Sequence, residues 1–507
     1  MQRQLLMGID IGTQSTRVAL IDPDGKVHAS HSGVYDMVTP RPGWAEQDPD
    51  VWWAVIVAGI RRVMAEAEVE PGEILAVGSD AQMHATIPLG RDGDLLSHGV
   101  QLWCDKRGAE LVETFKAQSS LRDAMRLAAN PPVPAWIGFK ILWLKTHEPG
   151  LYERTWKFVT GAGYLNYRLT GEVAVDWSEA SGSFLLDART LDWSPVLADH
   201  LGVSLDKLPP VAPSTQVVGR VSAEAARLTG LAAGTPVVAG AGDMMCMLIA
   251  AGLAERGRAL DISGTASDFC VYVDEPVLDP PFMNLHHAMP GWIPFGIVES
   301  GGGSLKWFKD ELCRAERLEA QQAGSDVYDI LNAEAAQVEP GGEGLLFLPY
   351  LMGERVLGTP YARGVFFGLT PRSGIGAMAR ALMEGICFEL RRTLEIVERA
   401  GNRITDVYTT GGGARSALWS QIKADIYRKP VYTLAASEGG ILGSAILAGV
   451  GAGVYPDIRA GAARCVHVAD AFQPRQALAA RYDYLYDLFQ EVHDRLQEPF
   501  GRLAHLP

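Results

Sequence analysis

An acidic residue stands in the middle of a long apolar stretch that is rich in glycine. Asp243 directly follows Gly240-Ala241-Gly242 and precedes Met244 and Met245. A carboxylate in such surroundings loses its hydration unless it gains partners, so its presence points to a function. In phosphoryl transfer, a carboxylate accepts the proton of the attacking hydroxyl and orients that group. The alternative interpretation is the N-cap of a helix through residues 247–251, and one residue can serve both purposes.

Two short turns are rich in Gly, Thr and Ser, one in each half of the chain. The first lies in residues 8–17, and the second is Gly264-Thr265-Ala266-Ser267. Such turns present main-chain N–H and hydroxyl groups that suit a phosphate, and Arg17 can add a charge-assisted contact. Asp10, at the expected end of a strand, is placed to hold Mg²⁺ through water. An ordinary hairpin explains either turn alone, but the two together predict a triphosphate held by both halves.

Two further glycine-rich runs lie in the second half. Gly411-Gly412-Gly413 follows an apolar strand and precedes a helix, so the main chain can approach a ligand closely there. A tight turn between strand and helix needs glycine as well. Residues 438–443 include small side chains that would let an adenine ring lie against a helix, and close helix packing explains them equally well.

Two short polar motifs in the first half suit a small polyhydroxylated ligand. Gln82-Met83-His84 follows an apolar strand, and Trp103-Cys104-Asp105 follows an apolar stretch that ends in Leu102. A sugar site needs several short polar groups and an aromatic wall, which these motifs supply. A histidine whose hydrogen bonds are purely structural is the more common case, so the motifs carry weight only together with a wider pattern.

The elements that must position these residues form a pattern that occurs twice. Residues 5–21 predict a strand, a Gly-Thr-Gln-Ser-Thr turn and a returning strand, and residues 258–273 predict the same hairpin again. The strand expected at 74–78 has its counterpart in the strand before Gly411. Asp48 and Pro49 predict the start of a helix, and residues 417–427 predict another. We therefore expect two duplicated domains, residues 1–245 and residues 246–507.

Length and composition predict a folded, multidomain protein. The chain has 507 residues, of which 48% are hydrophobic and 21% charged, which is typical of globular proteins and too long for one core. The net charge is −15, from 45 basic and 60 acidic residues, so nucleic acid and anionic membranes are disfavoured partners. A nucleotide remains possible because main-chain amides and Mg²⁺ can hold it locally.

The chain shows no export signal, which predicts a cytoplasmic protein. Its six cysteines lie far apart with no CxxC pair, so we expect reduced thiols rather than disulfides or a zinc site. The apolar window 235–254 is long enough to span a membrane, but it contains Asp243, whose charge is costly in lipid. We therefore reject a membrane span there.

The motifs assembled above resemble the FGGY family of carbohydrate kinases and, within it, the xylulokinases most closely. The match runs over nearly the whole chain, in order and with the same spacing. The resemblance implies an α/β fold of two actin-like (ribonuclease-H-like) domains around a central cleft, with the sugar bound mainly by the first and the nucleotide by the second. Its motifs in this chain are Gly8-Ile9-Asp10-Ile11-Gly12-Thr13, Trp44-Ala45-Glu46-Gln47-Asp48-Pro49, Gln82-Met83-His84, Leu102-Trp103-Cys104-Asp105, Gly242-Asp243, Ser263-Gly264-Thr265, Leu348-Pro349-Tyr350-Leu351-Met352-Gly353-Glu354-Arg355 and Gly411-Gly412-Gly413-Ala414-Arg415-Ser416.

The resemblance also implies residue roles, with ATP and Mg²⁺ as cofactors and a homodimer as the assembly. Asp243 is then the catalytic base, and Asp10 and Asp243 position the metal. The residues expected to line the sugar site are Gln82, Met83, His84, Trp103, Asp105 and Asp243. The residues expected to serve the nucleotide are Gly12, Thr13, Arg17, Gly264, Thr265, Gly412 and Gly413.

Two departures leave the acceptor open. Xylulokinases usually have Asn after the catalytic Asp, where this chain has Met244, and Gly after the Gln-Met-His run, where it has Ala85. The Arg-Glu pair of glycerol kinases is absent at Met83-His84, which argues against glycerol. A ketopentose such as xylulose or a related polyol is expected, with a tetrulose, a pentitol or an L-ketose as alternatives. A different class is an ATP-driven binding module like actin or Hsp70, which the small polar pocket disfavours.

Overall fold

The computed structural model describes residues 3–118, 120–278, 282–354, 359–435 and 438–505. The chain divides into two compact units, each of which is described by itself. The first unit joins Met1–Glu255 with two later segments, Asp274–Ile293 and Ala436–His467. The second unit consists of Arg256–Val273, Pro294–Ala435 and Val468–Pro507. Arg355, the last residue of one family motif, lies outside the described residues.

The first unit is built on a mixed sheet whose strands carry the predicted motifs at their ends. β1 and β2 form the expected antiparallel hairpin, and β5, β14 and β15 supply the parallel pairings beside it. The main path of the sheet runs in the order β13-β14-β5-β1-β2-β3, and β15 pairs with β5. The strands are β1 (Leu5–Ile11), β2 (Ser15–Ile21), β3 (Val27–Val34), β5 (Ile74–Ala81), β13 (Val217–Arg220), β14 (Pro236–Val238) and β15 (Ala241–Gly242).

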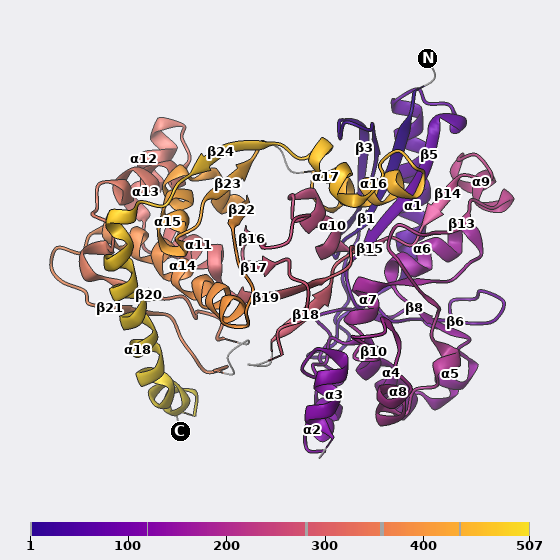
Figure 1. The fold of residues 1–507 in the computed structure, drawn as a ribbon, viewed down its shortest axis with the longest axis horizontal. Helices are drawn as coiled ribbons and strands as arrows, with labels where there is room; N and C mark the ends of the chain where they lie inside the picture. Colours follow the sequence, from indigo (N-terminus) through magenta and orange to yellow (C-terminus); the bar gives the residue numbers. More distant parts are fainter. Residues whose placement is uncertain (1–2, 119, 279–281, 355–358, 436–437, 506–507) are drawn as a thin grey trace. The chain divides into compact units, whose positions relative to one another are not determined.

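A helix from near the end of the chain covers one face of this sheet. α16 (Gly440–Gly451) lies against β1 and β5 and against α10 (Asp243–Ala250), and in Figure 1 its late-sequence colour stands out among the indigo strands. The approach is close because β1 and β5 present glycines there: a Cβ added to Gly8 or Gly78 would overlap the main-chain oxygen of Ile441 or Ser444. This packing explains why the segment Ala436–His467 belongs to the first unit, which the sequence halves do not indicate.

The helices α1 and α6 also pack on this sheet. α1 (Pro49–Glu66) contacts β2 and β3, and α6 (Gly161–Thr170) contacts β5. α1 begins where the sequence predicts, because Asp48 accepts a hydrogen bond from Asp50 N at 2.9 Å and Pro49 occupies the first turn. The buried apolar side of α1 includes Trp52, Ile56, Ile60 and Val63. The core of the unit therefore forms between helices and sheet.

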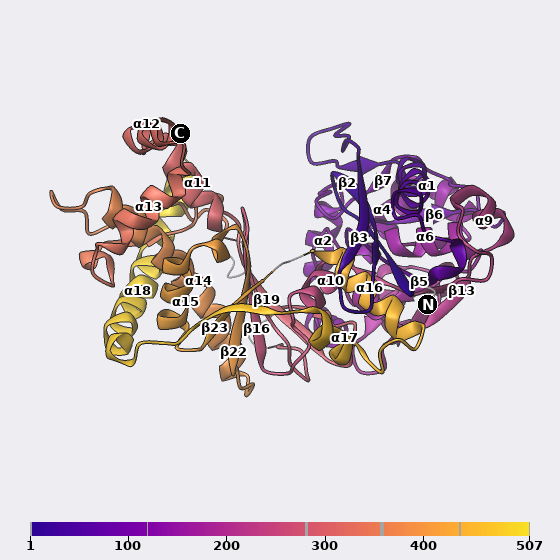
Figure 2. The same ribbon diagram turned by 90° about the horizontal axis from the view of Figure 1, so that it is seen from above.

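The second unit repeats the arrangement of the first. β16 and β17 form an antiparallel hairpin, β17 pairs antiparallel with β19, and β16, β22 and β23 are parallel neighbours. α14 (Ile375–Arg399) and α15 (Ala417–Tyr427) pack beside these strands, as Figure 2 shows. The duplication predicted from the hairpin motifs is confirmed in the strand order. The strands are β16 (Arg258–Ser263), β17 (Ser267–Val271), β19 (Trp292–Val298), β22 (Asp406–Gly411), β23 (Val431–Leu434) and β24 (Val468–Phe472).

The apolar window 235–254 does not form one continuous helix. It is divided among β14, β15 and α10, and Asp243 is the first residue of α10, with Gly242 as the N-cap. Across the described residues, we find no helix whose length and apolar character would let it cross a membrane. All six cysteines carry free thiols, as predicted.

Candidate active site

Three carboxyl groups meet at one edge of the first sheet. Asp10 lies near the end of β1, Asp80 lies opposite it near the end of the parallel strand β5, and Ala241 of β15 lies opposite Asp80. Asp243 follows β15 and starts α10. Because parallel strands end at the same edge, residues that are far apart in the sequence are brought together there.

The pKa of Asp243 is raised to about 7, chiefly by burial and further by the negative charge of Asp10. Main-chain hydrogen bonds from Met244 and Met83 oppose this rise, and the Met244 N–H donates to Asp243 Oδ1 at 2.7 Å. A carboxyl with a pKa near neutrality can accept a proton and release it under physiological conditions. The site therefore contains a group that suits general-base chemistry.

The other two carboxyls are also held in a proton-retaining environment. Burial raises the pKa of Asp10, although Asp80 and Arg17 oppose the rise, and burial and Asp10 raise the pKa of Asp80 well above its usual range. The Asp80 carboxyl faces the Asp10 carboxyl and the Ser444 hydroxyl. A cluster of carboxyl oxygens suits a hard divalent cation such as Mg²⁺, whose charge favours the ionised form of each group.

Arg17 lies on β2 opposite Asp10, but its guanidinium is also held from the other side. It forms an ion pair with Glu438 Oε2 at 2.7 Å and donates to the Glu438 carbonyl at 3.1 Å. Gly440 and Gly443, which follow Glu438, pack closely against their neighbours. A Cβ added to Gly440 would crowd the Asp80 carboxyl, and one added to Gly443 would overlap the main chain of Cys246. Close helix packing therefore accounts for the small residues at positions 440 and 443.

A hydrogen-bonded chain joins the first Gly-Thr turn to two of the expected sugar residues. Gln82 Nε2 donates to Gln47 Oε1 at 2.7 Å, and Gln47 Nε2 donates to the Thr13 carbonyl at 2.6 Å. Trp103 is 46% exposed, and its indole N–H donates to Thr13 Oγ1 at 3.2 Å. One hydrogen-bond network thus holds the first Gly-Thr turn together with Gln82 and Trp103, two of the residues expected to line the sugar site. Gln47 was not expected to take part, because its motif indicated only a helix start.

Asp105 is buried, and its carboxyl is already occupied. Arg107 Nε donates to both oxygens, at 2.9 and 3.0 Å, and the Ala45 N–H donates to Oδ2 at 2.8 Å. Arg107 also pairs with Glu46 at 2.6 Å and stacks over the ring of Trp44 at 3.6 Å. The turn that carries Trp103 is therefore fixed by Arg107, which pairs with Asp105 in the same turn and with Glu46 in the Trp44-to-Pro49 motif.

Met83 and His84 lie on the loop that follows β5, next to the start of α10. A Cβ added to Gly242 would overlap the Met83 side chain, so Met83 packs directly beside the residue that precedes Asp243. The His84 ring meets Trp136 edge-on, with centroids 4.9 Å apart. Burial and the charge of Lys140 hold the pKa of His84 well below its usual range, so the imidazole is neutral.

The second unit contains a cavity of about 480 Å³ built on the repeated hairpin and the glycine run. Its volume lies in the range of small-molecule sites. Gly264, Thr265, Gly412 and Gly413, all expected to serve the nucleotide, line it. The other lining residues are Ser263, Gly302, Gly303, Leu305, Lys306, Asp326, Tyr328, Asp329, Asn332, Arg415, Ser416 and Trp419.

A buried lysine lies beneath this cavity. Lys423 of α15 donates to Asp261 Oδ1 at 2.9 Å, to Ser263 Oγ at 2.6 Å and to Thr409 Oγ1 at 2.7 Å. Tyr427 donates to the second oxygen of Asp261 at 2.7 Å. All three N–H donors of the Lys423 ammonium group are used. The loss of hydration of the buried Lys423–Asp261 ion pair is therefore offset by hydrogen bonds inside the fold. It ties the ends of β16 and β22 together where their glycine turns begin.

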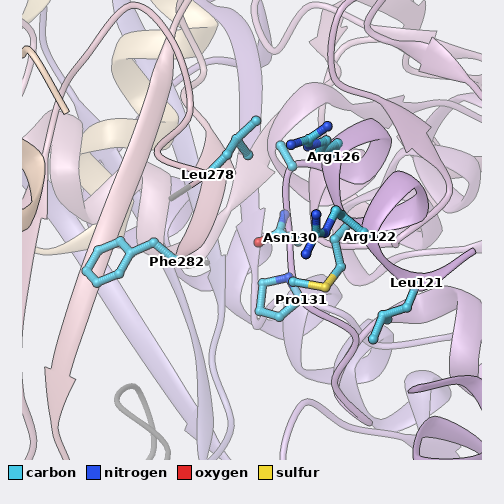
Figure 3. Close-up of a pocket in the computed structure, with 9 residues that line it drawn as sticks. Leu121, Arg122, Arg126, Asn130, Pro131, Leu278 and Phe282 are labelled. Carbon is cyan, nitrogen blue, oxygen red and sulfur yellow. The ribbon is translucent and has the colours of Figure 1, made fainter. Parts of the chain in front are cut away.

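A second cavity, of about 460 Å³, lies in the first unit away from the carboxyl cluster (Figure 3). Arg122 and Arg126 come from α3 (Leu121–Ala128), and Leu278 and Phe282, from a later segment, line the other side of the cavity. None of the sequence-predicted site residues lines it. The predicted site residues instead gather in two places, the edge of the first sheet and the cavity of the second unit.

Comparison with known proteins shows which family the chain resembles over its length. Models of the N-terminal and C-terminal domains of the FGGY family of carbohydrate kinases match residues 5–250 and 262–452. A xylulose kinase from Bacillus subtilis (strain 168) is 30% identical over 503 residues, covering 97% of each chain. The crystal structure of xylulose kinase from Rhodospirillum rubrum has a TM-score of 0.90 at 29% identity and covers 98% of this chain and 100% of its own. The structure of gluconate kinase from Lactobacillus acidophilus has a TM-score of 0.89 at 27% identity and covers 99% of each chain.

The family models and the fold define a carbohydrate kinase made of two actin-like, ribonuclease-H-like domains. Its relatives support ATP-dependent phosphorylation of a sugar in carbohydrate catabolism. The chain belongs to the FGGY family of carbohydrate kinases. The predicted family, fold class and enzyme class are thereby confirmed.

Proposed function

We propose that this enzyme transfers the γ-phosphoryl group of ATP to a hydroxyl of a small neutral sugar, with a ketopentose such as xylulose as the first candidate. The observation that carries the proposal is the position and pKa of Asp243. Its carboxyl is close enough to Asp10 for the two charges to interact, it follows Gly242, which packs against Met83, and its pKa is about 7. Asp243 accepts the proton of the attacking hydroxyl as the new bond to phosphorus forms. Asp243 is also hydrogen-bonded by main-chain groups, which fixes its direction.

We assign Mg²⁺ to the carboxyl cluster and the nucleotide to the cavity of the second unit. Asp10 and Asp243 would hold the metal. The neighbouring Asp80 would add a third carboxyl group to the same site. When bound, Mg²⁺ neutralises charge on the transferred phosphoryl group. Gly264, Thr265, Gly412 and Gly413 line the cavity, and in this proposal their main-chain amides bind phosphate oxygens.

We place Gly12, Thr13 and Arg17 in the first Gly-Thr turn on the nucleotide side. Thr13 is held by Gln47 and Trp103 and is therefore rigid enough to contribute to a phosphate site. The ion pair of Arg17 with Glu438 leaves its charge close to Asp10. In this proposal Arg17 helps to orient the metal-binding carboxyl as well as a phosphate.

The sugar site is assigned to Gln82, Met83, His84, Trp103 and Asp243. Asp105 supports it indirectly, because Arg107 and Ala45 occupy its carboxyl and hold the turn that carries Trp103. Met244 contacts Asp243 through its main-chain N–H, so this contact does not require the Asn that xylulokinases usually have there. With Met244 in place of that Asn, the site has one polar side chain fewer. This difference favours an acceptor whose hydroxyl groups are arranged differently from those of xylulose.

Two relatives raise gluconate as a second candidate acceptor, since the chain is similar to gluconokinases as well. The charge of the site argues against it. Asp243 must be ionised to act as the base, and in that form its negative charge repels a substrate carboxylate at the same place. A neutral acceptor avoids that repulsion.

A panel of acceptors scored by ADP release tests the proposal. The panel contains D-xylulose, L-xylulose, D-ribulose, L-ribulose, erythrulose, xylitol, ribitol, D-gluconate and glycerol, each with Mg·ATP. We expect the highest kcat/KM with a neutral ketose and at least tenfold less with gluconate. Strong preference for gluconate would refute the assignment of a neutral acceptor. ATP hydrolysis that no acceptor stimulates would refute the kinase and favour a binding module.

The remaining expectations belong to the same proposal. We propose a cytoplasmic enzyme, because ATP is available there and all six cysteines are free thiols. We retain the division of labour between residues 1–245 and 246–507, sugar in the first and nucleotide in the second. A homodimer is the expected assembly, and light scattering on the purified protein distinguishes it from a monomer.

A further inference from the structure

His84 occupies an unusual main-chain conformation. Its φ is +69°, in the left-handed region that only a few per cent of non-glycine residues adopt, with Asn, Asp and His the most frequent among them. Such strain persists only where the surrounding structure imposes it, and it gathers at functional sites. The cause must therefore be sought in the groups that hold the residue.

Two buried charged side chains hold the main chain of His84 from both sides. Lys140 Nζ donates to the His84 carbonyl at 2.6 Å, and the His84 N–H donates to Glu179 Oε2 at 2.9 Å. Lys140 is 1% exposed and Glu179 is 0% exposed. Thr86 Oγ1 adds a weaker bond to the same carbonyl at 3.3 Å. We call Lys140 and Glu179 the His84 clamp.

The ring of His84 is fixed as well. It meets Trp136 edge-on on one side, and on another it lies against Gly182, where an added Cβ would overlap the imidazole. Glu179 Oε2 lies 3.7 Å from Nδ1. Main chain and ring are thus both determined by neighbours, which is more than a solvent-exposed loop requires.

The clamp consists of two buried ionisable groups. Burial lowers the pKa of Lys140 to about 7, although the negative charges of Asp105 and Glu179 oppose the fall. Glu179 Oε1 has no hydrogen-bond partner in the described part of the chain, and burial raises the pKa of Glu179 well above its usual range. Buried ionisable groups with so few partners destabilise a protein. Stability therefore does not explain them.

The short helix that carries Glu179 also reaches the proposed base. α7 (Trp177–Ser181) begins at the N-cap Asp176, which accepts a hydrogen bond from Ser178 N at 2.8 Å. Ser178 Oγ accepts a hydrogen bond from the Gly242 N–H at 2.9 Å, one residue before Asp243. One rigid turn of helix thus contacts the His84 loop through Glu179 and the Asp243 loop through Ser178.

We propose that Lys140 and Glu179 are positioning residues for the acceptor sugar: they hold the His84 main chain so that the imidazole meets the sugar at a fixed place relative to Asp243. The inference rests on the proposed function, in which His84 contacts the acceptor. Lys140 and Glu179 act through His84 and need not touch the substrate. Because the acceptor oxygen of Glu179 is present in a carboxyl and in an amide, its role in the clamp does not depend on a charge.

The test compares three clamp variants in the full-length enzyme with Mg·ATP and the best acceptor of the panel. Lys140→Met removes the donor at similar volume, Glu179→Leu removes the acceptor, and Glu179→Gln retains it. We expect Lys140→Met and Glu179→Leu to raise the acceptor KM about 10- to 100-fold, with the KM for ATP unchanged. Glu179→Gln restores at least part of the loss caused by Glu179→Leu.

Two controls separate positioning from folding. Lys145→Met changes a lysine of the same helix, α4 (Ile137–His147), that also donates to a main-chain carbonyl, at Gly202, away from His84. It is expected to leave both KM values unchanged. His84→Gly removes the ring and relieves the backbone strain, so Lys140→Met added to it should raise the acceptor KM no further. Thermal unfolding of every variant reports whether it is folded.

Each outcome decides the matter. Acceptor KM values within twofold of wild type in folded Lys140→Met overturn the clamp, and so does an equal rise in the acceptor KM and the ATP KM. Additive effects in the His84→Gly background would show that Lys140 acts by another route and would also overturn it. A wild-type enzyme that phosphorylates no acceptor of the panel overturns the proposed function, and the clamp with it.

Discussion

Replacing Asp243 with Asn should slow turnover about 10²- to 10⁴-fold and, at the same time, stabilise the protein. The pKa of Asp243 is raised to about 7 from an ordinary value of 3.8, so the fold favours the neutral form. At about 1.36 kcal/mol for each pH unit, ionising the carboxyl in the fold costs about 4 kcal/mol. Asp243 is partly exposed, and solvent screening reduces that figure. We expect a net gain of about 1–3 kcal/mol for Asp243→Asn above pH 7.

The sign of the pH dependence follows from the raised pKa. Above pH 7 Asp243 is ionised in both the folded and the unfolded protein, so the full penalty applies and the Asn variant gains most. As the pH falls toward 4 the carboxyl takes up a proton in the fold first, the penalty disappears, and the two proteins converge in stability. The gain is therefore present at pH 8 and lost at pH 4.

The assay is urea unfolding of wild type and Asp243→Asn at pH 5, 6, 7 and 8 in buffer without Mg²⁺ or ATP. Asp310→Asn is the matched control, because Asp310 lies at the surface with its side chain 30% exposed, and hydrogen bonds from Lys306 and Lys309 lower its pKa. That variant should lose rather than gain stability at pH 7. An Asp243→Asn protein that is no more stable than wild type at pH 8, or a gain that does not shrink by pH 5, would refute the electrostatic account.

Three further substitutions test other parts of the structure. Gly182→Ala places a Cβ against the His84 imidazole, so the acceptor KM should rise about tenfold while the ATP KM stays constant; unchanged acceptor kinetics would contradict the contact. Lys423→Met leaves Asp261 buried without its cation and should lower the free energy of unfolding by about 3–5 kcal/mol in urea, and a loss below about 1 kcal/mol would speak against it. Gly302→Ala brings a Cβ onto the Gly264 carbonyl in the cavity of the second unit, so calorimetry should show ATP binding weakened about tenfold, whereas unaltered binding would remove the nucleotide from this cavity.

Local signals in the sequence predict several elements well. Asp48 and Pro49 mark the start of α1, both Gly-Thr hairpins form, and α15 spans the predicted residues 417–427. These features depend on neighbours a few positions away, such as a capping side chain or a glycine in a turn. The sequence therefore contains what is needed to predict them.

Long-range packing is harder to infer from one sequence. No linker or composition change indicates that Ala436–His467 packs with the first unit, because the small residues that allow α16 to approach β1 and β5 also suit other ligands and partners. Lys140 and Glu179 lie in ordinary helical surroundings, and only the fold brings them to His84. Asp80 falls between a strand and a recognised motif, so its place beside Asp10 follows from strand register alone.

The most direct test of the account is a single-turnover experiment with Asp243→Asn. Enzyme in excess over Mg·ATP is mixed with a saturating concentration of the best acceptor, and sugar phosphate is measured over time. If Asp243 is the base, the rate of phosphoryl transfer falls about 10²- to 10⁴-fold, while the affinities for acceptor and ATP stay within a few-fold of wild type. A rate close to that of wild type, in a variant that binds both substrates, would contradict the central claim.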